Sequence, residues 1–438
     1  MTYRSADRTN RLSRALTSAR IGVIDRVRER RTAAERGGGF DFVSEAAHPS
    51  SLPADLHAVY GGGSPHRCYA RAAAIGEAVE RYALSAVPNA ARRLRAITDV
   101  PDAACTLSDL QWFLEEQYAE LGFPFLKPES TWCYDWVTGH SLLTSSPASM
   151  PSALVYLPYR AAPGELATSF QTSVGTSCAD GRVEAAYRSV LELIERDALT
   201  ICWESRAPFP PIEQEAVEAS ARAICGKNRP FRLRAFDLTT DLAIPVMLVL
   251  ALARYDGPAV AIGTAADLVP KRALERAIAE AATSWRSAAF ISARSKISVD
   301  TVLQPRPDRS AVIQHTLYYT RREGLRHFSF LLENSASPRG LSDCADGIPA
   351  ADIAMQRCAE CLRRAGYDVV LFDITPADIA STSLHVVRAV SPGLVRPTIG
   401  TRTRHLANPR IREVPYILGL EPAPVPVARL LNQVHPAP

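Results

Sequence analysis

The chain has 438 residues, of which 47% are hydrophobic and 22% charged, and its formal net charge at pH 7 is +4. These are globular proportions, so they exclude a wholly disordered, collagenous or coiled-coil chain. No apolar run approaches the roughly 18 residues of a membrane span, and the N-terminus lacks the pattern of a secretory signal. We therefore expect a cytoplasmic protein without a membrane segment.

The positive excess lies at the front of the chain. Residues 1–40 contain ten arginines against four acidic residues. A basic arm can attract an acidic peptide or a nucleic acid, but a solvated amphipathic helix also explains the pattern. Aromatic residues do not interleave with basic clusters, so nucleic-acid binding is not expected. We assign residues 1–59 to a basic N-terminal arm and loop.

The next elements alternate small-residue turns with helices and strands. A glycine-rich turn, YGGGSP, leads into residues 68–84, whose alanine density and apolar spacing predict a helix. A small-residue loop (168–182) precedes a second predicted helix at 183–202. Residues 231–253 read as two buried strands, and 261–288 as a glycine turn followed by another long helix.

Part of the sequence occurs twice. GEAVERYA (76–83) and LELIERDA (191–198) share the pattern Glu-x-x-Glu-Arg-x-Ala. RLRAFDLTTDLAI and YDVVLFDITPADI each place Asp-x-Thr directly after a predicted strand. We therefore predict a mixed α/β (α+β) fold of internally duplicated type, with helices packed on mixed sheets, rather than a string of independent domains.

The repeated motif places two carboxylates and one guanidinium on one face of each helix, because residues three and four apart share a face. One interpretation is a solvent-facing ladder of salt bridges, worth about 0.3–0.5 kcal/mol per pair. In the second helix, Glu184 and Arg188 extend the stripe backwards. The motif residues are Glu77, Glu80 and Arg81 in the first helix and Glu192, Glu195 and Arg196 in the second.

The motif occurs twice, each time beside a turn of small residues, and this favours a ligand-binding site. Clustered carboxylates repel one another unless a hard cation neutralises them, and Mg²⁺ prefers a few carboxylates together with waters and phosphate oxygens. Turns of small residues bring backbone amides close to phosphate, and Arg81 and Arg196 would contact its oxygens. The sequence has no P-loop, dinucleotide-binding glycine turn or kinase motif set. We therefore predict a Mg²⁺-nucleotide site of an unfamiliar kind.

An ordered series of blocks resembles the YcaO superfamily, whose members use ATP to activate backbone amides of peptides. The resemblance implies a YcaO-like catalytic domain at 60–410 with ATP and Mg²⁺ as cofactors. It implies that the metal ligands are Glu77, Glu192 and Glu195, that the nucleotide contacts are Glu80, Arg81, Ser177, Glu184 and Glu280, and that Arg196 is catalytic. The blocks are GGGSP with AAAIGEAVERYAL, SVGTSCADGRVEAAYRSVLELIERDAL, FDLTTDLAIPV, GTAADLVPKRALERAIAEAATS and VVRAVSPGLVRP.

Four positions depart from the family pattern. Ala73 and Arg188 replace serines, Gly63 replaces a lysine, and Thr283 with Ser284 stands where a glutamine is usual. The predicted metal ligands are kept while parts of the nucleotide pocket are altered. A catalytically silent docking or scaffold paralogue therefore stays open as an alternative.

Residues 411–438 form a proline-rich tail. In azoline-forming members such a tail reaches the active site, so the resemblance implies that the final residue, Pro438, is catalytic. The sequence PAPVP lies twelve residues before the end, and the last four residues are HPAP. A rigid polyproline surface segment explains the same composition.

The function implied by the resemblance is O-phosphorylation of a peptide amide by ATP. We expect cyclodehydration of Cys, Ser or Thr to thiazoline or oxazoline in a ribosomally made peptide of the bacteriocin type. Thioamide or amidine formation stays open, because the nucleophile belongs to the substrate or a partner. The expected partners are a precursor peptide and a separate leader-binding, E1-like or TfuA-like protein. The oligomeric state, a homodimer included, is left open.

Overall fold

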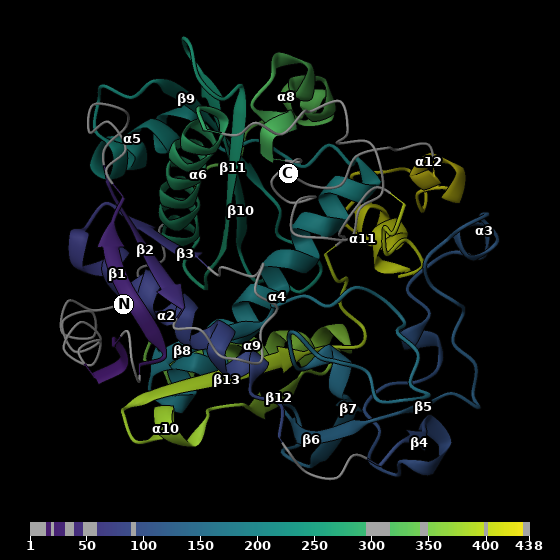
Figure 1. Cartoon of the computed structure of the whole chain (residues 1–438). Coiled ribbons are helices and arrows are strands. Elements are labelled where there is room, and N and C mark those ends of the chain that lie inside the picture. Colours follow the sequence, from purple (N-terminus) through teal and green to yellow (C-terminus); the bar gives the residue numbers. More distant parts are fainter. Residues whose placement is uncertain are drawn as a thin grey trace.

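The computed structural model describes residues 15–18, 22–30, 39–46, 59–88, 93–294, 316–341, 349–397 and 402–431. Their helices and strands form the predicted mixed α+β fold (Figure 1). None of the helices in these ranges combines the length and the apolar character that a membrane crossing requires. The helices are α2 Arg67–Ser85, α3 Glu115–Tyr118, α4 Arg182–Ser205, α5 Gln214–Cys225, α6 Pro270–Ser292, α8 Ser329–Leu332, α9 Ala351–Ala365, α10 Ala377–Ala380, α11 Arg410–Ile417 and α12 Val427–Leu431.

The described strands form four sheets, and neighbouring strands pair antiparallel. Their orders are β1-β2-β3, β11-β10-β9, β7-β6-β12-β13-β8 and β4-β5. The strands are β1 Ile24–Glu29, β2 Phe40–Ala46, β3 Val59–Ser64, β4 Arg95–Ala96, β5 Cys133–Tyr134, β6 Trp136–Ser141, β7 Pro147–Pro151, β8 Thr176–Asp180, β9 Phe231–Asp237, β10 Val246–Ala253, β11 Val260–Ala266, β12 Val370–Asp373 and β13 Leu384–Val390.

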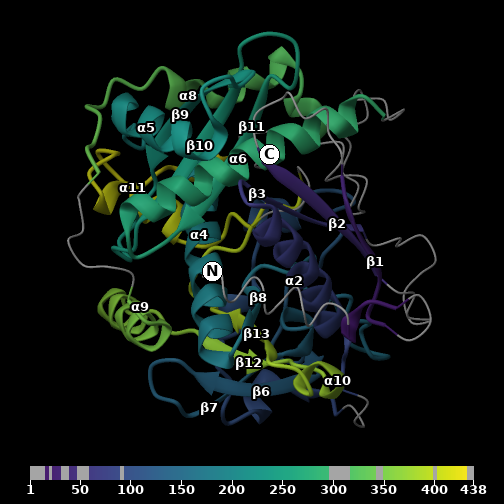
Figure 2. The same cartoon turned by 90° about the vertical axis from the view of Figure 1, so that its left-hand side faces the viewer.

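Helix α4 joins the two largest sheets. It packs against β8 and β13 of the five-stranded sheet and against β10 and β11 of the β9–β11 sheet. Figure 2 shows α4 running from one sheet to the other, with α2 beside it. Most of its residues from Ser189 onwards are buried, and Val190, Ile194 and Ala198 belong to the main hydrophobic core. The predicted apolar stripe is thus a core-facing surface, and it fixes how the helix turns its polar face.

The same local arrangement occurs twice, around α2 and α6. Each helix follows a three-stranded antiparallel sheet and packs against its last strand. A Cβ on Gly62 of β3 would lie 2.3 Å from the backbone nitrogen of Ala74, and one on Gly263 of β11 would lie 2.2 Å from that of Ala281. Only glycine allows this close approach, which packs each helix directly against its strand.

The repeated Asp-x-Thr segments also form the same turn. Asp237, at the end of β9, accepts hydrogen bonds from the backbone N–H and hydroxyl of Thr239 at 2.9 and 2.5 Å. Asp373, at the end of β12, accepts the equivalent bonds from Thr375 at 3.1 and 2.5 Å. Such Asx turns satisfy backbone groups where a strand ends. The sequence similarity therefore reflects a shared local structure.

Candidate active site

Three helices each hold one carboxylate against a backbone N–H of a neighbouring segment. Glu80 of α2 accepts from Cys178 of β8 at 2.7 Å. Glu192 of α4 accepts from Gly175, just before β8, at 3.1 Å, and Glu280 of α6 accepts from Thr264 of β11 at 2.8 Å. Hydrogen bonds from the backbone fix the direction of each carboxylate. Three predicted site residues from separate parts of the chain are therefore rigidly placed.

Thr264 also organises the second motif helix. Its hydroxyl donates to Glu195 at 2.6 Å and accepts from Arg196 at 3.4 Å. Arg196 also lies 3.4 Å from Glu195 and 3.9 Å from Glu280. Burial disfavours the Arg196 cation, but the charges of Glu195, Glu280 and Glu192 outweigh burial and raise its pKa. The Arg196 guanidinium is thus a positive charge surrounded by the carboxylates of Glu195, Glu280 and Glu192.

The carboxylates carry more negative charge together than their surroundings neutralise. Burial raises the pKa of Glu80 to about 8, and the charges of Glu192 and Glu77 add to this shift. Burial also raises the pKa of Glu280 to about 7, with a further contribution from Glu195. For Glu192 burial is again the largest cause of a raised pKa. These shifts indicate that the carboxylates of α2, α4 and α6 interact electrostatically across one site.

The remaining predicted residues lie at the edge of this group. Glu77 pairs with Arg81 at 3.4 Å, and each side chain is about one-third exposed (33% and 30%). Ser177 is buried in β8 beside Cys178, and it pairs with Val387 of β13.

Glu184, in the first turn of α4, accepts a 2.7 Å hydrogen bond from Arg188. This bond joins neighbours on one helix face, as in the salt-bridge interpretation of the stripe. Pro438 lies outside the described residues.

Within the described ranges, no group of three or more His, Cys, Asp and Glu side chains is arranged to hold a metal ion. Glu77, Glu192 and Glu195 therefore remain predicted metal ligands. The structure shows that Glu77 and Glu192 both act on the pKa of Glu80, and that Glu195 acts on that of Glu192.

Sequence reasoning missed Arg388, a buried residue of β13. It donates to the Thr176 hydroxyl at 2.9 Å and to the carbonyl oxygens of Thr172 at 2.8 Å and Leu154 at 3.0 Å. Its positive charge acts to lower the pKa of Glu192. A lone arginine in the apolar run VVRAV was the available signal, because arginine is rarely buried without a specific role.

Gly175 was also missed. Its φ of +84° is unfavourable for other residues, and a Cβ there would lie 2.4 Å from the carbonyl oxygen of Ala389. The turn that offers its N–H to Glu192 therefore requires glycine.

Two of the altered positions of the family pattern, Gly63 and Thr283, meet in one packed corner. A Cβ on Gly63 would lie 2.2 Å from the Cγ2 of Thr283. Arg286 donates to the Thr283 hydroxyl at 3.1 Å and pairs with buried Asp41 at 2.8 Å. A lysine at Gly63 would collide with Thr283, so these two departures occur at a single contact.

Comparisons with known proteins identify the family of the chain. A family model described as a YcaO cyclodehydratase binding ATP and Mg²⁺ matches residues 61–395. An uncharacterized protein of Methanothermobacter thermautotrophicus is 24% identical over 343 residues, which cover 77% of this chain and 81% of that protein.

Two solved structures share the fold. A heterocyclase in complex with substrate and cofactor superposes with a TM-score of 0.78 at 19% identity, covering 99% of this chain and 57% of its own. The chain thus spans little more than half the length of that heterocyclase. YcaO from Methanopyrus kandleri, bound with AMPPCP and Mg²⁺, gives a TM-score of 0.61 at 19% identity, covering 89% and 91%. The chain belongs to the YcaO family, whose cofactors are ATP and Mg²⁺.

Proposed function

We propose that this chain uses ATP and Mg²⁺ to activate a backbone amide of a peptide, with cyclodehydration to an azoline as the outcome. The observation that carries the proposal is a cluster of carboxylates from three helices: those of α4 and α6 lie around Arg196, and Glu80 of α2 lies close enough to Glu192 for that charge to raise its pKa. Hydrogen bonds from Cys178, Gly175 and Thr264 fix the carboxylates of Glu80, Glu192 and Glu280. A solvated salt-bridge ladder would not give carboxylates with pKa values raised to about 8 and about 7.

The donor set fits Mg²⁺ and a triphosphate. Carboxylate oxygens are the hard ligands that Mg²⁺ selects, and a bound cation would stabilise carboxylates whose charged form is disfavoured mainly by burial and in part by neighbouring carboxylates. Glu77, Glu192 and Glu195 would hold the metal. The residues facing the nucleotide would be Glu80, Arg81, Ser177, Glu184 and Glu280.

Mg²⁺-ATP supplies the phosphoryl group that turns an amide oxygen into a leaving group. Arg196, oriented by Thr264 and Glu195, would neutralise charge on the transferred phosphate oxygens. The substrate's thiol or hydroxyl would add to the preceding carbonyl carbon and lose its proton. The amide nitrogen would then lose its proton as the C=N bond forms and the carbonyl oxygen departs as phosphate. With sulfide as nucleophile the product is a thioamide, and with an amine an amidine.

The substrate of this reaction would be a ribosomally made precursor peptide. We propose a separate leader-binding partner, E1-like or TfuA-like, that supplies peptide recognition. We also propose that the proline-rich tail brings Pro438 to the site, as in azoline-forming members.

Mass spectrometry of the peptide product tests this function. The chain is incubated with a candidate precursor peptide, ATP and Mg²⁺, with and without the partner. We expect loss of one water per ring and release of ADP and phosphate; replacement of oxygen by sulfur would identify the thioamide reaction instead.

Glu192→Gln should abolish both products, whereas Glu360→Gln should not, because the Glu360 pair with Arg364 is exposed on α9. Absence of ATP turnover with every peptide and partner would favour the scaffold alternative.

A further inference from the structure

A small pocket adjoins the carboxylates of the candidate site. Val174, which precedes Gly175, and Leu193, which follows Glu192, both line the pocket. Gly175 donates a backbone hydrogen bond to Glu192. The rest of the lining comes mainly from β13 and the segment that follows it, up to Pro397. Most lining side chains are apolar, and Arg388 and Arg396 are the two charged ones.

The two arginines have neutral partners. Arg388 is only 3% exposed, and its hydrogen bonds go to carbonyl oxygens and to the Thr176 hydroxyl. Among the described residues its Nε is buried and has no hydrogen-bond partner. Arg396 donates to the Ser169 hydroxyl at 3.2 Å and lies over the Trp112 ring, 4.7 Å from its centroid. Buried cations are normally paired with an anion.

Electrostatics agree with this geometry. Burial lowers the pKa of Arg388 to about 9, and the charge of Arg396 contributes to the shift. Burial likewise lowers the pKa of Arg396 to about 10. Glu192 acts in the opposite direction on Arg388 but does not reverse the net change. The pocket therefore brings together two guanidinium cations, the buried Arg388 and the half-buried Arg396, and the charge of Arg396 disfavours that of Arg388.

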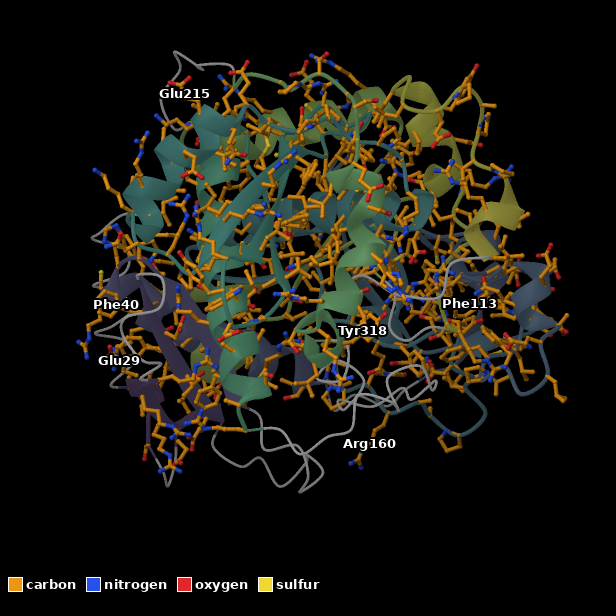
Figure 3. The ribbon with its side chains drawn as sticks, turned by 90° about the horizontal axis from the view of Figure 1, so that it is seen from above. Glu29, Phe40, Phe113, Arg160, Glu215 and Tyr318 are labelled. Carbon is orange, nitrogen blue, oxygen red and sulfur yellow. The ribbon has the colours of Figure 1, made fainter. Side chains whose placement is uncertain are left out.

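The walls of the pocket are fixed before any ligand arrives. Asp197 of α4 accepts the backbone N–H of Val395 at 2.8 Å and pairs with buried Arg410 at 2.7 Å. The Nδ1 of His405 donates to the Arg396 carbonyl oxygen at 3.4 Å, and the His405 ring packs against Phe113, which Figure 3 labels. This support keeps the Arg396 segment beside α4.

We propose that this pocket binds a carboxylate carried by a peptide, either an acidic side chain or a terminal carboxylate. The pocket would thereby select and position the peptide next to the ATP site. A guanidinium matches a carboxylate with two parallel N–H bonds, and the apolar walls suit the peptide groups that bear it better than a free phosphate ion. The inference rests on the proposed function, since it assigns the substrate class of the same site.

Fluorescence anisotropy with three labelled peptides tests the proposal in the absence of ATP. The peptides share an apolar sequence: one has an internal Glu and an amidated end, one has a free C-terminal carboxylate, and one has Gln and an amidated end. At least one carboxylate peptide should bind about tenfold more tightly than the neutral one, and the tighter of the two identifies the source of the carboxylate.

Arg396→Gln should reduce binding of the carboxylate peptide to the level of the neutral peptide, and Arg396→Lys should restore only part of it. Arg339→Gln, in an exposed pair with Asp237, is the matched control and should bind like the wild type. Thermal unfolding of each variant verifies that it is folded.

Equal binding of the three peptides, or unchanged binding by folded Arg396→Gln, would overturn the proposal. Displacement of Mg²⁺-ATP by inorganic phosphate, lost in Arg396→Gln while peptide binding is retained, would also overturn it by assigning the pocket to phosphate. Mg²⁺-ATP binding is measured separately with Arg396→Gln. A failure of the carboxylate inference therefore leaves the proposed ATP chemistry standing, and the reverse also holds.

Discussion

The cluster of carboxylates and the arginine pocket meet at the Val174–Gly175 turn. They differ in the sign of their charge and in the backbone groups that hold them. Carboxylates of three helices are held by backbone N–H groups, whereas Arg388 is held by backbone carbonyl oxygens. In both regions burial is the main force that shifts pKa values toward the neutral form. Each region gathers buried charge of one sign, and this teaches that each is suited to a ligand group of the other sign.

Asp197 of α4, the helix that carries Glu192 and Glu195, holds the Val395 segment of the arginine pocket, so its removal is the most severe test of their connection. Its carboxylate is completely buried, and it pairs with Arg410 while accepting the Val395 N–H. Asp197→Ala should lower the free energy of unfolding by about 3 kcal/mol, the lower end of the cost of breaking a buried pair, because Arg410 would lose one buried partner but keep Asp241. Urea denaturation measures the change. Glu360→Ala should cost less than about 1 kcal/mol, and an equally small loss at Asp197 would contradict this role.

Gly175 is the point where the two regions touch. Gly175→Ala should cost about 1–3 kcal/mol through its positive φ and the collision with the Ala389 carbonyl. It should also weaken both Mg²⁺-ATP and peptide binding.

Gly122→Ala is the matched control, since Gly122 has φ +73° but no atom within 4 Å of the added Cβ. In thermal unfolding this variant should lose stability through backbone strain alone. Its ligand binding should not change. If Gly175→Ala and Gly122→Ala had the same effects on unfolding and on ligand binding, Gly175 would not connect the two regions.

On the acidic side, stability should fall as pH rises. The pKa of Glu80 is raised to about 8 in the folded protein, so its contribution to stability is complete below the ordinary value of 4.5 and is lost as pH rises toward 8. Glu80→Gln should remove this loss, and the variant should be more stable than the wild type at pH 8 while binding Mg²⁺-ATP less tightly. Parallel unfolding curves of the two proteins across this range would refute the assignment.

On the basic side, His405 makes stability depend on pH with the opposite sign. Burial lowers its pKa to about 3, and the charge of Arg396 contributes. Its contribution to stability is therefore present above the ordinary value of 6.5 and is lost as pH falls toward 3. His405→Phe, which keeps a ring against Trp112 and Phe113, should lose less stability between pH 6.5 and pH 4 in thermal unfolding than the wild type does.

Local patterns in the sequence predicted much of the fold and one side of the site. The helix expected at 183–202 is α4, and its acidic stripe was expected to face a ligand because residues three and four apart share a face. The Asp-x-Thr repeat likewise predicted equivalent positions after β9 and β12. Such features depend on neighbours in the chain.

Features that depend on distant contacts could not be predicted. Arg388 acquires its role from carbonyl oxygens more than 200 residues away, and the Gly63–Thr283 contact joins β3 to α6. No local pattern encodes which carbonyl group or side chain will occupy that space. From the sequence alone, Gly63 and Thr283 were therefore two unrelated departures from the family pattern.

Calorimetric titration of the apo chain with Mg²⁺-ATP tests the central claim, that the acidic faces of α2 and α4 bind the metal-bound triphosphate. We expect binding by the wild type and by Glu360→Gln, and a loss of more than about 100-fold in affinity for Glu192→Gln, since even supporting residues of metal sites are worth 10–100-fold. Equal affinity of the wild type and Glu192→Gln, with both proteins folded, would contradict the claim.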